Sequence, residues 1–124
     1  MRLTGARCSL TFERTTKSKT IDLYYISLIS KDLERMVDHL IQVSSKEAEF
    51  LNSIYEVIDQ LQDIIENTNN LNHKIALQFI KKVSKIKSFE VKDIKSYDKE
   101  RMRLSLTTIA EVVTDWAITR EIEK

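Results

Sequence analysis

Two pairs of carboxylates have a spacing that could hold a cation. Glu34 and Asp38 are four residues apart, and so are Glu111 and Asp115. Side chains four positions apart on a helix lie on one face, so each pair places two negative charges side by side. Hard ions such as magnesium, manganese and iron bind carboxylate oxygens. The four residues are therefore candidate ligands for iron or another divalent metal ion.

Spacing alone does not distinguish such a site from a solvated helix face. The chain has 19 acidic residues among 124, and Asp59 with Asp63 makes a third pair of the same spacing. Lys31 and Arg35 also lie beside the first pair and could neutralise it.

A second set of candidate residues is basic. Residues 71–103 contain ten basic and four acidic side chains. Clustered positive charge is the main requirement for phosphate contacts, so the alternative function is that of a small helical nucleic-acid-binding subunit. The residues that would carry this function are Lys81, Lys82, Lys85, Lys87, Lys92 and Lys95.

The sequence offers no set of nucleophile, base and orienting group. Cys8 is the only cysteine, which excludes an internal disulfide and a zinc-thiolate cluster. His39 and His73 have no evident partner, and we expect His39 to be solvated or paired with its neighbour Asp38. We therefore predict that the protein is not an enzyme.

The composition indicates a cytoplasmic protein without membrane insertion. No apolar run is long enough to span a bilayer, and the amino terminus lacks the apolar core of a secretory signal. Residues 21–70 carry ten acidic and three basic side chains, in contrast to the basic segment that follows. Such blocks favour docking within the molecule or between subunits.

The elements that position these residues are predicted to be helices, because proline is absent and the only glycine is Gly5. A 3-4 spacing of apolar residues predicts helices over about 20–44, 46–66, 71–88 and 94–122, with a loop at 89–93. Thr20 and Asp22 are expected to cap the first helix, and Ser45 the second. Short connections favour an all-α, antiparallel four-helix bundle.

Two apolar stripes define the predicted core faces of the first and last helices. The stripe of the first helix is Ile26, Ile29, Leu33, Met36, Leu40 and Val43, and that of the last is Met102, Leu106, Ile109, Val113 and Trp116. Left exposed, the stripe over residues 26–43 would favour association with a second chain.

Residues 1–19 have a different pattern. Cys8, Leu10 and Phe12 alternate with polar residues, which is a weak strand signal without a second strand to pair with. We expect residues 1–19 to be an extended or flexible arm and residues 20–124 to be the helical domain.

The residues around the first carboxylate pair resemble the signature of the PhoU family. The run Leu33-Glu34-Arg35-Met36-Val37-Asp38-His39 is similar to that family's Leu-Glu-Arg-Ile-Gly-Asp-His, on the third helix of a three-helix repeat. A second copy follows at a shift of 77 residues, in Ala110-Glu111-Val112-Val113-Thr114-Asp115-Trp116-Ala117. The shift places Glu34 on Glu111, Asp38 on Asp115 and Ile41 on Ile118.

This resemblance implies a fold and a role. Residues 46–122 correspond to one full three-helix repeat, and residues 20–44 to the last helix of a preceding repeat. PhoU proteins regulate phosphate uptake and phosphate-responsive signalling through contacts with a transporter ATPase and a sensor kinase. Some bind iron or other ions through such carboxylate pairs. The resemblance thus implies a non-enzymatic regulator or adaptor, and we expect it to form a homo-oligomer.

Overall fold

Helix dominates the chain, as expected where no proline interrupts the backbone. The computed structural model describes residues 2–43 and 47–123, with side chains at 19–43 and 47–122. The helices are α1 (Arg2–Leu40), α2 (Ala48–Glu66), α3 (His73–Ser84) and α4 (Ile94–Glu123), and a short 3₁₀ turn η1 (Thr68–Asn70) joins α2 to α3. These ranges contain no strand.

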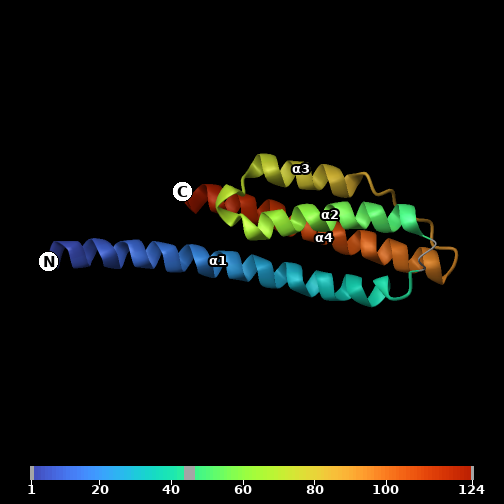
Figure 1. Ribbon diagram of the computed structural model, residues 1–124, viewed down its shortest axis with the longest axis horizontal. Helices are drawn as coiled ribbons and strands as arrows, with labels where there is room; N and C mark the ends of the chain where they lie inside the picture. Colours follow the sequence, from blue (N-terminus) through green and yellow to red (C-terminus); the bar gives the residue numbers. More distant parts are fainter. Residues whose placement is uncertain (1, 44–46, 124) are drawn as a thin grey trace.

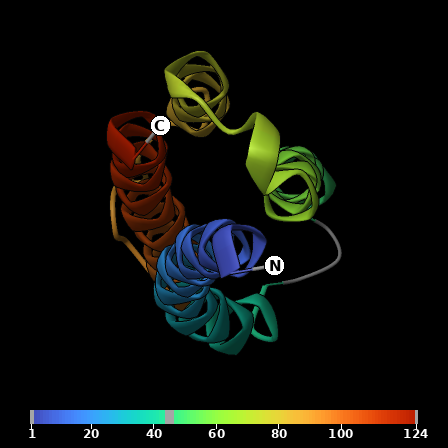
Figure 2. The ribbon, with the colours of Figure 1, turned by 90° about the vertical axis from the view of Figure 1, so that its left-hand side faces the viewer.

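The helices form an antiparallel bundle in which each neighbour runs in the opposite direction (Figure 1). Seen along the bundle axis, they form a ring in the order α1, α4, α3, α2 (Figure 2). The contact between α1 and α4 is the most extensive, followed by that between α3 and α4. The predicted all-α bundle is therefore confirmed, and α4 is the helix against which both α1 and α3 pack.

One hydrophobic core fills the centre of the ring. The predicted stripe of α4, from Met102 to Trp116, is completely buried. Phe79 from α3 and Leu61 from α2 are buried against it. Burying large apolar side chains contributes about 1.5–3 kcal/mol each, so this stripe is a principal source of stability. None of the described helices is sufficiently long and apolar to cross a membrane.

The apolar stripe of α1 also packs into the core of the bundle. Ile29 and Met36 are buried, and Ile26 and Leu33 are half-buried against the same core. The possibility that this stripe is left exposed for association is therefore wrong. The long contact with α4 covers its central part, and Leu40 near its end is 38% exposed.

Residues 2–19, which we expected to be an extended or flexible arm, form the first part of α1. This part of the helix projects beyond the ends of the other helices (Figure 1). No breaker separates it from residues 20–40, and a helix pairs its backbone groups internally where a lone strand could not. Thr20 and Asp22 consequently lie within a helix and do not cap one.

The remaining helix boundaries follow local hydrogen bonding. The predicted cap Ser45 lies outside the described residues, and Glu47 precedes α2 without a side-chain capping bond. The amide oxygen of Asn72 accepts a hydrogen bond from the backbone N–H of Ile75, so α3 begins at His73 and not at Leu71. It also ends at Ser84, earlier than predicted, and Ile86 then turns into the core.

Candidate functional site

Glu34 and Asp38 lie on the outer face of the carboxyl-terminal half of α1. Both side chains are exposed, and so are the neighbouring Val37 and Ile41. Among the described residues, neither carboxylate has a hydrogen bond or ion pair. The nearby Arg35 instead binds Asp32, at 3.5 Å. This pair therefore presents two unneutralised charges to solvent.

Glu111 and Asp115 are exposed on α4 and border a groove of about 660 Å³ between α3 and α4. Lys87 and Arg103 line the same groove. Positive charge within this groove partly offsets the two carboxylates and weakens their attraction for a cation.

The structure does not bring the two carboxylate pairs together. Tyr25 of α1 contacts Thr119 of α4, and His39 contacts Asp98, which fixes how the antiparallel helices align. At about 1.5 Å per residue, the midpoints of the two pairs are then offset by on the order of 10 Å along the axis. Across residues 19–43 and 47–122, no three His, Cys, Asp or Glu side chains cluster as ligands for one metal ion.

A polar cluster that the sequence did not reveal joins α1 to α4. The carboxylate of Asp22 accepts hydrogen bonds from Trp116 Nε1 at 2.8 Å and from Arg120 Nη1 at 2.7 Å. The side chains of Asp22 and Arg120 are largely buried, and Trp116 is fully buried. The ring of Tyr25 stacks on Trp116, with the centroids 6.0 Å apart. We call Asp22, Trp116 and Arg120 the Asp22 cluster.

The two histidines have partners far away in the sequence. His39 Nδ1 lies 2.8 Å from a carboxylate oxygen of the buried Asp98. The expected pairing of His39 with its neighbour Asp38 is not the contact that it makes. His73 Nδ1 lies 2.7 Å from Glu121, which also accepts the backbone N–H of His73. Both contacts attach a helix to α4, so each histidine has a role in holding the bundle together.

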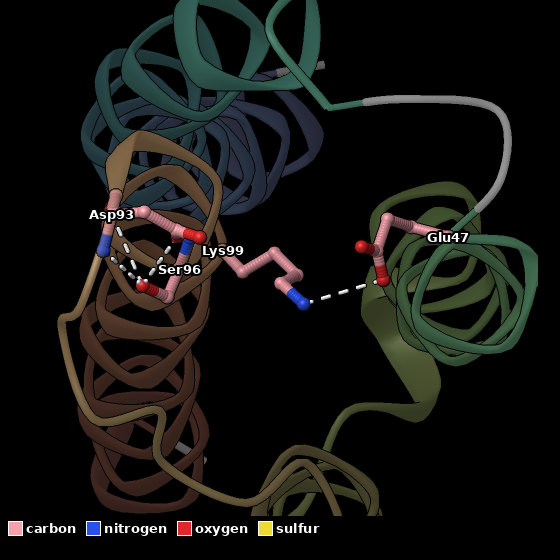
Figure 3. Close-up of polar contacts among 4 residues, drawn as sticks. All are labelled: Glu47, Asp93, Ser96 and Lys99. Atoms are coloured by element: carbon pink, nitrogen blue, oxygen red, sulfur yellow. Dashed lines mark hydrogen bonds and ion pairs between the residues drawn. The ribbon is translucent and has the colours of Figure 1, made fainter.

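The start of α4 is fixed by side-chain hydrogen bonds (Figure 3). Asp93 Oδ1 accepts the backbone N–H of Ser96, and Ser96 Oγ accepts the backbone N–H of Asp93. The backbone bond from Ser96 lowers the pKa of Asp93 below its usual value. From the next turn, Lys99 reaches across to Glu47 at 3.2 Å and so connects α4 to the beginning of α2 (Figure 3).

Glu100 anchors the segment between α3 and α4. It accepts hydrogen bonds from the Arg103 side chain and from the backbone N–H of Phe89, the latter at 2.6 Å. The bond from Arg103 lowers the pKa of Glu100, because it favours the charged form. The ring of Phe89 is thereby held against Phe50 of α2.

The six candidate lysines are exposed but do not form one surface. Lys81, Lys82 and Lys85 line a groove of about 720 Å³ between α2 and α3, together with polar residues such as Gln60 and Gln78. The other three lie elsewhere: Lys87 lines the groove on the α4 side, Lys92 pairs with Glu90 at 3.8 Å, and Lys95 is in the first turn of α4. The structure therefore groups three of the six.

Comparisons with known proteins place the chain in no family. No family model matches it. No curated protein matches it either, and no solved structure does.

Metal binding by the first carboxylate pair stays a prediction. Chain purified without chelator should contain stoichiometric iron, manganese, zinc or magnesium, measured by elemental analysis. Glu34→Gln with Asp38→Asn should remove it, because neutral side chains bind hard cations weakly. Asp59→Asn with Asp63→Asn, on the exposed face of α2, is the matched control and should retain the metal. Substoichiometric metal that is the same in all preparations would reject the site.

Proposed function

We propose that this chain is a non-enzymatic, PhoU-like regulator that acts through protein contacts on the outer face of α1. In this proposal α2, α3 and α4 make up one three-helix repeat, and α1 is the last helix of a preceding repeat. The partner is a phosphate-transporter ATPase or a phosphate-responsive sensor kinase, as the resemblance to the PhoU signature implies.

The observation that carries the proposal is a mixed acidic and apolar patch on α1. Glu34, Val37, Asp38 and Ile41 follow one another along the exposed face, with Val37 47% and Ile41 74% exposed. Two like charges at this spacing cost about 0.2–0.5 kcal/mol, and the described residues provide no counter-ion. A partner with a basic, partly apolar surface would remove this repulsion and cover both apolar side chains.

The burial of the two signature copies supports their equivalence. At the shift of 77 residues, the buried Ile29 and Met36 of α1 fall on Leu106 and Val113 of α4, which are also buried. The exposed Glu34 likewise falls on the exposed Glu111. Although the exposed Leu40 falls on the buried Ala117, these positions of the signature have the same burial in both helices. This is what a duplicated helix predicts.

The test is direct binding to the two candidate partners. The purified chain is titrated against the phosphate-transporter ATPase and the phosphate sensor kinase of the same cell, by calorimetry. Saturable binding to one of them is expected. Glu34→Lys with Asp38→Lys should weaken it by at least about tenfold, because like charges would then meet at the contact.

The chain contains a matched control for this experiment. Asp59→Lys with Asp63→Lys makes the same charge change at an exposed pair of the same spacing on α2. This variant should bind the partner as the wild type does. The proposal is contradicted if neither candidate binds, or if both double variants lose affinity equally.

A second candidate function rests on the groove between α2 and α3. Lys81, Lys82 and Lys85 line it together with the single carboxylate of Asp63, and none of the three lysines has an ion pair among the described residues. Three adjacent ammonium groups could contact successive phosphates of a nucleic acid.

Salt dependence tests this alternative. Binding to duplex or single-stranded nucleic acid should be present at about 50 mM salt and fall steeply as salt increases. Changing the three groove lysines to alanine should reduce the slope of log affinity against log salt by about 2–3, since each lost phosphate contact contributes about 0.7–0.9. Lys31→Ala, an exposed change on α1, should leave the slope unchanged. Absence of binding at about 50 mM salt would reject this function.

A further inference from the structure

The face of α4 that points away from the core carries a second stripe with a seven-residue period. Ile94, Tyr97, Leu104, Ile118 and Ile122 are its apolar members, and all are exposed, Ile94 and Ile122 by about three quarters. Arg101, Thr108, Glu111 and Asp115 fill the positions between them and are exposed too. We call these nine residues the outer stripe of α4. Its 3-4 spacing is that of a helix seam that packs against another helix.

The outer stripe has the same character toward its two ends when read in either direction from Thr108, whereas Leu104 and Glu111, next to the centre, differ in character. Ile94 and Ile122 lie fourteen residues before and after Thr108, and Tyr97 and Ile118 lie eleven before and ten after. Two copies of α4 can pack antiparallel with their Thr108 residues facing each other. A residue before Thr108 in one copy then lies beside the residue that is equally far after Thr108 in the other copy. The apolar ends of one helix then meet the apolar ends of the other.

The charged positions are complementary in the same alignment. Arg101 lies seven residues before Thr108 and Asp115 seven after, with Glu111 one turn away from Asp115. Within one chain, Arg101 and Asp115 are about 20 Å apart along α4, and none of the three charges has an ion-pair partner among the described residues. Between two antiparallel helices, Arg101 of each chain meets the carboxylates of the other.

We propose that the outer stripe of α4 is the dimer interface of this protein and that its occupant is the same stripe of a second copy. The contact is two-fold symmetric, with the axis at Thr108, so each charge contact occurs twice. The seam is about 42 Å long, at about 1.5 Å per residue from Ile94 to Ile122. In this dimer, the guanidinium of Arg101 of one copy is the partner of Glu111 and Asp115 of the other. Glu34 and Asp38 on α1 lie outside the interface.

Charge reversal and its rescue test the proposal on the full chain. Sedimentation equilibrium should show a dimer for the wild type. Arg101→Asp and Asp115→Arg should each weaken dimerisation by at least about tenfold, because each places like charges opposite one another at two places. The variant with both changes restores opposite charges and should return to within about threefold of the wild-type constant. Asp59→Arg, an exposed change on α2, should have no effect.

Cross-linking tests the position of the two-fold axis. In a Cys8→Ser background, Thr108→Cys should give a covalent dimer on mild oxidation, because the two sulfurs face each other across the axis. Glu56→Cys, on the exposed face of α2, is the control and should remain monomeric on denaturing gels. Helix content is checked by circular dichroism in every variant.

Three results would overturn the proposal. They are a monomeric wild type, a dimer unaffected by both single charge reversals, and cross-linking at Thr108→Cys no greater than at the control. Glu34→Lys with Asp38→Lys should remain dimeric, so loss of the dimer and loss of the regulatory partner are separate readouts.

Discussion

The carboxylate of Asp22 holds α1 against α4, and the placement of the exposed residues of α1 depends on how these two helices align. Trp116 and Arg120 donate to it from successive turns of α4, at 2.8 and 2.7 Å. In this largely buried setting, removing one charge leaves the other unpaired, which typically costs about 3–5 kcal/mol. Together with the apolar stripe of α1 and the contacts of Tyr25 and His39, it sets the register and the rotation of α1. Ile29 and Met36 therefore face the core, and Glu34 and Asp38 face solvent.

α4 has two faces with different roles. The stripe from Met102 to Trp116 is completely buried and forms the centre of the core, because α1 and α3 both pack on this side. The outer stripe is opposite and carries apolar side chains that the bundle covers only in part. A helix that is apolar on two opposite sides fits a core position combined with a subunit contact. In the proposed regulator, the dimer forms through α4 and the partner surface lies on α1.

Apolar spacing predicted the helices and their core faces, because a buried stripe must repeat with the helix period. The last helix was expected at 94–122 and is found at Ile94–Glu123, with all five predicted core residues buried. Contacts between helices were not predictable in this way. Asp22 with Arg120 and His39 with Asp98 are 98 and 59 residues apart, and their pairing depends on a helix register that periodicity does not specify. The exposed placement of Glu34 and Asp38 follows instead from the apolar spacing, because both lie on the side of α1 away from Ile29 and Met36.

The contact between Asp22 and Arg120 can be measured directly by a double-mutant cycle. The free energies of unfolding in urea are compared for wild type, Asp22→Asn, Arg120→Gln and the double variant. If this pair sets the register of α1, the coupling energy should be about 2 kcal/mol or more, as for other largely buried ion pairs. A coupling energy within about 0.3 kcal/mol of zero would contradict the account, because α1 would then be held on α4 by apolar packing alone.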